Sequence, residues 1–302
     1  MKKLALTLFL MAGLTAWSQT NPSDAPVTDT IKHWKSKGNF SALFNQSTFD
    51  NWLAGGENNI SGTLGLNYDI NYNKDGWNWD NKIMASYGVV KTRTSSFAKK
   101  TDDRLEINSL LGRQMKTGSR WFYSAFMNFR TQFTKGYNYT KDANGAEQRE
   151  EYTNFFSPAY LSFGPGVMYK KDDNFKFNIA PATSKLTFVD AAFTLPNEAY
   201  FGVEEGESMR YELGMNASLY YKVGIVANVS LENILNLYSN YLEDPQNVDI
   251  DYQLNIVMKI NKYLATNISF QTIYDDNAFR GFQVRQVFGV SFNYGFGDAA
   301  KK

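Results

Sequence analysis

The most constraining feature of this sequence is a strict alternation of apolar and polar residues on both sides of a tight turn, over residues 58–90. A period of two predicts β-strands that each carry one apolar face. Asp75-Gly76, between the two halves, tolerates the positive φ angles that a tight hairpin turn requires. In the first half the apolar face holds Ile60, Gly62, Leu64, Leu66, Tyr68, Ile70 and Tyr72.

Each half of this hairpin is longer than the ~5–6 residues usual in globular proteins and exceeds the ~9–11 residues with which a tilted strand crosses a bilayer. The same alternation recurs along the rest of the chain, so the sequence predicts twelve strands. We place them at residues 38–49, 58–72, 77–90, 104–116, 120–135, 160–170, 175–189, 208–221, 225–237, 248–260, 263–274 and 281–296.

The predicted connections alternate between short and long. The short ones are residues 73–76, 116–119, 171–174, 222–224 and 261–262, and the long ones are 50–57, 92–103, 136–157, 190–207, 238–247 and 275–280. An even number of strands with this alternation predicts an all-β fold, a transmembrane antiparallel up-and-down barrel. The short turns and both termini then lie in the periplasm. Closure leaves no strand edge in lipid, where an unpaired backbone group is costly.

Composition agrees with this fold. Mean hydropathy is −0.42, yet 43% of residues are hydrophobic and 16% are aromatic. A soluble β-sandwich or lipocalin is the alternative, but its strands would be shorter and its outward faces charged. Aromatic residues near the turns are instead typical of a membrane-interface girdle. They are Tyr72, Trp77, Trp79, Trp121, Tyr123, Tyr169, Tyr221, Tyr263 and Tyr294.

The N-terminus predicts export. Lys2 and Lys3 precede an apolar run, residues 4–16, and small residues before Gln19 fit a cleavage site, so residues 1–18 are interpreted as a signal peptide. A membrane anchor is the alternative, although the run is short for a spanning helix. Residues 19–37 are polar and are expected to form a flexible periplasmic lead-in, followed by a bacterial outer-membrane barrel over residues 38–297.

The last predicted strand carries a second signal. Gly289, Phe292, Tyr294 and Phe296 resemble the C-terminal pattern read by the outer-membrane assembly machinery, although an ordinary edge strand would look similar. The expected partners are therefore this machinery during insertion, and the lipid and lipopolysaccharide of the outer membrane. A net charge of +1 gives no reason to expect nucleic acid.

The residues of catalytic chemistry are scarce. The chain has no cysteine, and its single histidine, His33, precedes the first strand. Metal sites of His and Cys, and barrel enzymes with an imidazole base, are therefore excluded. Asp249 and Asp251 could act as acid and base, but adjacent acids on one strand face more often line a lumen. We expect no enzymatic activity, no cofactor and no metal.

The lumen face is the remaining candidate site. By alternation it holds five bases and five acids: Asp69, Lys82, Glu106, Arg130, Arg210, Glu212, Asp249, Asp251, Lys259 and Arg285. These side chains could pair and fill the interior, because an unpaired buried charge costs several kcal/mol. They could equally line a narrow channel that selects a small solute. A barrel of ~12 strands lies in size between small barrels that are filled by side chains and wide porins of ~16–18 strands that hold an aqueous channel.

Several motifs resemble those of an uncharacterised outer-membrane barrel family of Bacteroidetes, known only as a domain of unknown function. The motifs are Asn51-Trp52 with Gly55-Gly56, Pro158-Ala159-Tyr160-Leu161 with Gly164 and Gly166, Tyr169-Lys170, Asn240-Tyr241 with Pro245, Lys259-Ile260-Asn261-Lys262-Tyr263, Tyr274-Asp275 and Gln286-Val287-Phe288-Gly289. The resemblance implies the fold and location and no activity. The first motif is a surface-loop candidate, either a hairpin tip or a ligand site.

Two hypotheses of function follow. The first is a narrow channel or a binding barrel for a small solute. The second is a structural or accessory subunit that docks onto a larger outer-membrane assembly.

Overall fold

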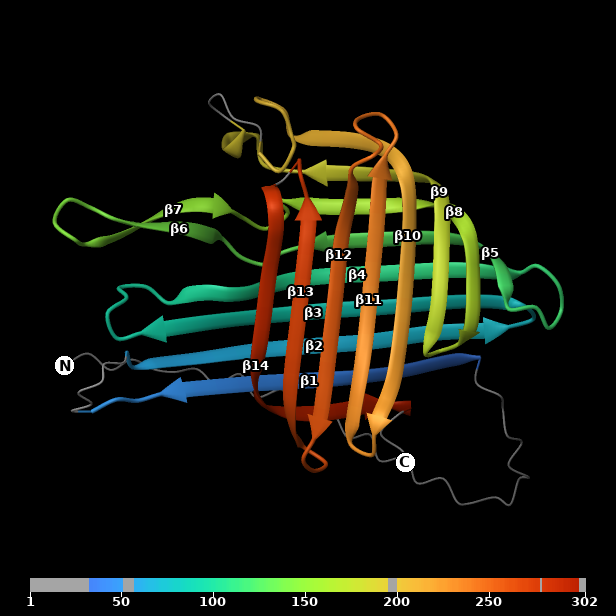
Figure 1. Ribbon diagram of the computed structural model, residues 1–302, viewed down its shortest axis with the longest axis horizontal. Helices are drawn as coiled ribbons and strands as arrows, with labels where there is room; N and C mark the ends of the chain where they lie inside the picture. The colour runs from blue at the N-terminus through green and yellow to red at the C-terminus, as the bar shows by residue number, and fades with distance from the viewer. Residues whose placement is uncertain (1–32, 51–56, 195–199, 278, 299–302) are drawn as a thin grey trace, which may run out of the picture. The chain divides into compact units, whose positions relative to one another are not determined.

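The computed structural model describes residues 33–50, 57–194, 200–277 and 279–298, all within one compact unit, His33–Lys302. Twelve antiparallel strands close into a barrel (Figure 1), which confirms the predicted fold. They are β1 (Trp34–Ser47), β2 (Asn59–Lys74), β3 (Trp77–Thr92), β4 (Lys99–Gln114), β5 (Trp121–Thr131), β8 (Ala159–Asp172), β9 (Phe175–Phe188), β10 (Met209–Val226), β11 (Val229–Asn240), β12 (Val248–Lys259), β13 (Leu264–Asp275) and β14 (Phe279–Gly297).

The hairpin β2–β3 forms as the sequence predicts. Its ladder runs without interruption from Asn59 opposite Thr92 to Lys74 opposite Trp77. Asp75 and Gly76 connect the strands with φ angles of 52° and 78°, and a tight turn with two positive φ angles matches the twist of the paired strands. We call this end of the barrel the turn end and the opposite end the loop end.

The barrel closes between the first and last strands. β1 pairs with β14 from Lys37 opposite Gly297 to Phe44 opposite Val290, so both described ends of the chain lie at the turn end. The Phe296 ring covers Gly38, where a Cβ atom would lie 2.1 Å from the ring. Phe296 also stacks on Tyr68 with ring centroids 5.6 Å apart. The aromatic end of β14 therefore packs across the closing seam.

Several predicted boundaries were wrong. β1 begins at Trp34 rather than residue 38, and β10 continues to Val226, so residues 222–224 are strand and the turn is residues 227–228. The connection between β13 and β14 is short, so long and short connections do not alternate throughout. Antiparallel strands extend wherever backbone groups find partners, which a hydropathy pattern does not report.

The predicted loop at residues 136–157 contains a further hairpin. β6 (Gly136–Lys141) and β7 (Glu147–Thr153) pair with each other as a separate two-stranded sheet. Figure 1 shows this hairpin projecting past the wall at the loop end. The rest of the secondary structure described is one 3₁₀ turn, Ala191–Phe193, and no described helix is long and apolar enough to cross a membrane.

The two faces of the wall have opposite chemistry. Large apolar side chains on the outward face are exposed, among them Leu64 (54%) and Phe288 (59%), whereas Asp80 (4%) and Glu106 (2%) are buried on the inward face. This is the reverse of a soluble globular protein. Aromatic pairs gather at the turn end. The ring centroids of Trp34 and Tyr72 lie 5.0 Å apart, and those of Trp121 and Tyr169 lie 5.2 Å apart.

Candidate functional site

The barrel encloses a cavity of about 210 Å³, which is the candidate functional site. Most of the residues that line it are polar or charged, and they come from both ends of the barrel, for example Asp173 near the turn end and Asp275 near the loop end. Three layers of charged side chains cross or border it, and each is built from strands distant in sequence.

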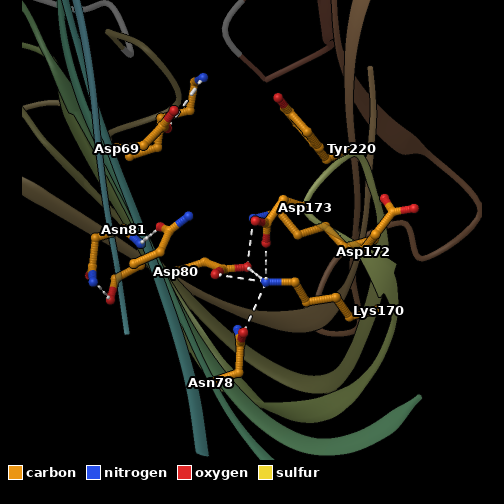
Figure 2. Close-up of polar contacts among 12 residues, drawn as sticks. Asp69, Asn78, Asp80, Asn81, Lys170, Asp172, Asp173 and Tyr220 are labelled. Atoms are coloured by element: carbon orange, nitrogen blue, oxygen red, sulfur yellow. Dashed lines mark hydrogen bonds and ion pairs between the residues drawn. The ribbon is translucent and has the colours of Figure 1, made fainter. Parts of the chain in front are cut away.

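The first layer is a buried cluster at the turn end, where β3 faces β8 and β9 (Figure 2). Lys170 donates from Nζ to both carboxylate oxygens of Asp80, each at 2.9 Å, and to Asn78 Oδ1 at 2.9 Å. Lys176 lies 2.9 Å from the same carboxylate, and Asp173 lies 3.0 Å from Lys170. The Asp80 carboxylate is therefore fully engaged by two ammonium groups in a site that excludes water.

Beside this cluster, one ion pair spans the lumen. Lys82 on β3 lies 3.3 Å from Glu232 on β11, and these strands stand directly opposite each other in the ring of twelve. Lys82 also lies 3.6 Å from Asp69, and Tyr220 donates a hydrogen bond to Glu232 at 2.7 Å. Because the pair joins opposite walls, the lumen is constricted at this layer.

The second layer lies further along the barrel. Arg130 on β5 donates to Asp251 on β12 at 2.6 Å. Arg104 on β4 pairs with Glu106 and reaches Gln253, on the opposite strand β12, at 3.1 Å. Asn108 and Asn128 donate to Glu106 at 2.9 and 3.0 Å. The buried carboxylates of this layer thus have charged and neutral donors.

The third layer, at the loop end, centres on Lys185 of β9. Its ammonium lies 2.7 Å from Asp249, 3.3 Å from Glu212 and 3.5 Å from Asp275, and 4.9 Å from the Tyr238 ring centroid. Oxygens of Asp249, Asp275 and Asp276 lie within 4.8 Å of one another, a spacing that could hold a metal ion. The sequence offered no reason to expect a metal, because Asp249 meets Asp275 and Asp276 only across the fold.

All ten predicted lumen residues lie on the inward-facing side of their strands, and eight of them belong to the three layers just described or border them. Arg210 lies 3.6 Å from Glu212 and 2.6 Å from Glu243. Arg285 sits apart from the layers and pairs with Asp102 at 2.5 Å. Lys259 is exposed at the turn end of β12 and joins none of the layers.

Sequence reasoning missed the residues on which the layers depend, notably Asp80, Lys170, Lys176, Lys185 and Glu232. A β-bulge explains Lys185. Thr183 and Ala180 sit opposite Gly214 and Asn216, so β9 has one extra residue there. Past a bulge, the residues that face inward change from even-numbered to odd-numbered. Lys176 and Lys185 therefore share the inward face although one number is even and the other is odd.

The remaining predicted residues are placed elsewhere. Asn51, Trp52, Gly55 and Gly56 lie outside the described residues, as do residues 1–32. In the proposed assembly signal, Phe292 (45%) and Tyr294 (53%) are exposed on the outward face, and a Cβ at Gly289 would lie 3.2 Å from Leu43. His33 packs edge-on against Tyr72, with ring centroids 6.4 Å apart.

Comparison with known proteins finds one family that matches part of the chain and a set of solved barrels of similar fold. A family described as "Protein of unknown function (DUF3078)" matches residues 44–137, from β1 to the start of β6 and less than half of the chain. No curated protein matches the sequence.

Among solved structures, the translocator domain of the autotransporter NalP from Neisseria meningitidis is similar, at 7% identity, TM-score 0.41, and coverage of 89% of this chain and 90% of that one. An outer-membrane channel from Pseudomonas putida F1 has 9% identity and a TM-score of 0.39, with 92% and 100% covered. Over residues 44–137 this chain is thus similar to a family of unknown function, and its own strand pairing establishes the closed barrel.

Proposed function

We propose that this protein spans the bacterial outer membrane and that its lumen is a narrow passage or binding chamber for a small polar solute. The observation that carries the proposal is a polar, charged cavity lined from both ends of the barrel inside an apolar outer wall.

The outer wall supports the membrane location. Residues such as Leu64, Val284 and Phe288 expose more than half of their surface on the outward face. In water such a continuous band would forfeit about 25 cal/mol for each Å² of apolar surface. A bilayer removes that cost, and a closed barrel satisfies every strand's backbone within it. An even number of strands is typical of bacterial outer-membrane barrels.

The ion pairs across the lumen support a narrow interior. Lys82 with Glu232, and Arg104 with Gln253, join opposite walls. A solute that enters must fit between these layers and exchange hydrogen bonds with them, which favours small polar molecules. Asp249 and Asp251 are each held by a basic side chain, so we assign them to the lining rather than to catalysis.

Conductance in planar lipid bilayers tests this function. The purified protein should give small, resolvable conductance steps, and the double variant Lys82→Ala/Glu232→Ala should give larger ones because it removes a bridge across the lumen. The matched control is Lys141→Ala/Glu150→Ala, which removes one basic and one acidic exposed side chain of the β6–β7 hairpin and should leave the conductance unchanged. Silence of both the wild type and the Lys82 variant would rule out a passage.

The second candidate is an accessory subunit of an outer-membrane assembly. The β6–β7 hairpin supports it, because within the described residues these strands pair only with each other, and free strand edges are sites for strand addition by a partner. Extraction in mild detergent should then recover a stoichiometric companion, and Thr140→Pro in β6 should release it. Recovery of the barrel alone would exclude this role.

A further inference from the structure

A groove of about 330 Å³ lies on the outside of the barrel at the loop end, between the wall and the β6–β7 hairpin. We call it the hairpin groove. Its lining includes Tyr87, Val89, Lys100, Lys135, Tyr139 and Arg149. It is separate from the lumen, and neither hypothesis of function uses it.

The floor of the hairpin groove continues the lipid-facing wall. Tyr87 is 40% exposed and lies directly opposite Leu64, which is 54% exposed, in the β2–β3 ladder. Val89 follows two residues later on β3. An apolar tail that lies along the outer wall would therefore lead into the groove.

The rest of the lining includes three basic side chains. Lys100, Lys135 and Arg149 contribute three cationic groups, and no lining residue described is acidic. Lys100 is held at 2.9 Å by Asp103, and Lys135 at 2.6 Å by Glu151. The hydrogen bond that Lys135 donates to Glu151 raises the pKa of Lys135, so its ammonium stays charged.

Arg149 differs from the two lysines. Its guanidinium lies 4.3 Å from the Tyr137 ring centroid and 4.7 Å from that of Phe97. Among the described residues it forms no ion pair within 4 Å. Stacking fixes the plane of the guanidinium and leaves its N–H donors available, the geometry with which arginine binds phosphate through two hydrogen bonds.

The hairpin that forms one side of the groove is fixed to the barrel loop beside it. Glu147 of β7 lies 2.5 Å from Lys99 and accepts hydrogen bonds from Ser96 N at 2.8 Å and Ser95 Oγ at 3.0 Å. Lys99 lies 4.7 Å from the Tyr139 ring centroid. The groove is thus formed before any ligand binds.

We propose that the hairpin groove binds the phosphate-bearing headgroup of an outer-leaflet lipid. Arg149, with Lys135, contacts the phosphate, whereas the donors of Lys100 are taken by Asp103, Gln132 and Thr134. The acyl chains lie on the wall below Tyr87 and Val89. A lipid rather than a free anion fits because the groove opens onto the apolar wall. The inference rests on the proposed function for the location in the outer membrane, with the loop end at the outer surface as the lengths of the connections predict.

Native mass spectrometry of the full chain in neutral detergent tests the proposal, with lipid A carrying two phosphates as the probe and its dephosphorylated form for comparison. The wild type should retain the phosphorylated lipid. Arg149→Gln/Lys135→Gln should weaken binding by about tenfold or more, in line with two basic contacts to an anionic headgroup. The affinity of Arg149→Lys for the lipid should lie between those of the wild type and of the double variant. Lysine keeps the positive charge but lacks the planar guanidinium that stacks on the aromatic rings.

The matched control is Lys141→Gln, which removes an exposed charge from the same hairpin outside the groove and should bind as the wild type does. Equal retention of the dephosphorylated lipid, or undiminished binding by Arg149→Gln/Lys135→Gln, would overturn the proposal. Full competition by millimolar inorganic phosphate would show a site for free anions and overturn the lipid assignment.

Heat-modifiable migration in gels separates the two possible failures. If the variants remain folded barrels that insert into vesicles and the lipid does not bind, the groove assignment is wrong and the proposed function stands. If the wild type does not insert into vesicles at all, the proposed function fails first.

Discussion

At the scale of single residues, the interior is stable because each buried charge has a specific partner. Asp80 illustrates this, since it is 4% exposed and accepts from Lys170 and Lys176 at 2.9 Å. A buried pair contributes modestly over an apolar replacement, but the loss of one partner leaves the other charge uncompensated. Substitutions that remove one member should therefore be more harmful than their volume suggests.

Asp80→Asn should lower the free energy of unfolding by about 3–5 kcal/mol, because it leaves two ammonium groups facing a neutral amide. Urea unfolding in lipid vesicles, followed by tryptophan fluorescence, measures the change. The control is Asp173→Asn, which removes an acid that is 61% exposed beside the same Lys170 and should cost less than about 1 kcal/mol. Equal effects would contradict the role assigned to burial.

At the scale of the strands, bulges and glycines shape the wall around β8, β9 and β10. The ladder between β8 and β9 shifts between Phe163 and Val167, where Gly164, Pro165 and Gly166 lie. A Cβ at Gly166 would lie 2.2 Å from the Ile179 carbonyl oxygen. Glycine at such a position allows two backbones to approach closely, which curves the wall and turns side chains to the other face.

Two glycines of β10 provide a matched test. A Cβ at Gly214 would lie 2.0 Å from the Ser239 carbonyl oxygen, whereas one at Gly224 would meet nothing within 4 Å. Gly214→Ala should therefore destabilise the barrel by about 1–3 kcal/mol, the usual cost of forcing backbone shifts. Gly224→Ala should leave it within about 0.5 kcal/mol of wild type. Urea unfolding in vesicles measures both, and similar values would refute the packing described.

Acid should loosen the β6–β7 hairpin by protonating one residue, Glu147. The hydrogen bond from Lys99 lowers the pKa of Glu147 from 4.5 to about 2. Because the folded pKa lies below the ordinary value, the contribution of this ion pair is complete above about pH 4.5 and is lost as the pH falls through 2.

A spin label at the hairpin tip, on Asn144→Cys, reports this directly. Its mobility should stay constant from pH 7 to 5 and rise only as the pH approaches 2. Adding Glu147→Gln should raise the mobility at every pH, since the carboxylate is then absent. A label that loosens already near pH 6 would assign the transition to another group.

At the scale of the whole molecule, the barrel separates an apolar exterior from a charged interior, and the proposed membrane location predicts different effects of substitutions on the two faces. Leu64 on the outward face is 54% exposed, whereas Asn67, three residues later, has the opposite facing on the same strand. Substitutions at two positions of one strand therefore compare the outward face with the inward face.

Leu64→Arg should impair assembly and cost about 2–4 kcal/mol if it lies near the middle of the bilayer, because the charge enters hydrocarbon. Asn67→Arg should be far milder, since the alternation of the strand turns this exposed side chain away from the outward face. Insertion yield into vesicles and urea unfolding measure the two variants. Equal tolerance would show that the outward face does not contact lipid.

Orientation has its own test. With the turn end in the periplasm, a cysteine at Ser95 or Asn144 should react with an impermeant maleimide on intact cells, and one at Asp75 should react only after lysis. The opposite pattern would place the loops in the periplasm and would contradict the membrane orientation that the lipid proposed for the hairpin groove requires.

The sequence by itself determined the strand number, the antiparallel order and the two faces of the wall. These properties depend on a local period of two and on turn residues such as Asp75 and Gly76, whose conformational preferences act between neighbours in the chain. It also placed charges such as Lys82 and Asp251 on the inward face, because successive side chains of a regular strand point alternately inward and outward.

Only the tertiary structure decided which charges meet. Lys82 and Glu232 are 150 residues apart in the sequence, and they touch because closure brings β3 and β11 to opposite sides of one narrow lumen. The bulge in β9 and the pairing of β6 with β7 likewise depend on backbone hydrogen bonds between strands, which no single-strand pattern records. Closure is a property of the complete ring, so the ion pairs and the outer groove that it creates exist only in the folded barrel.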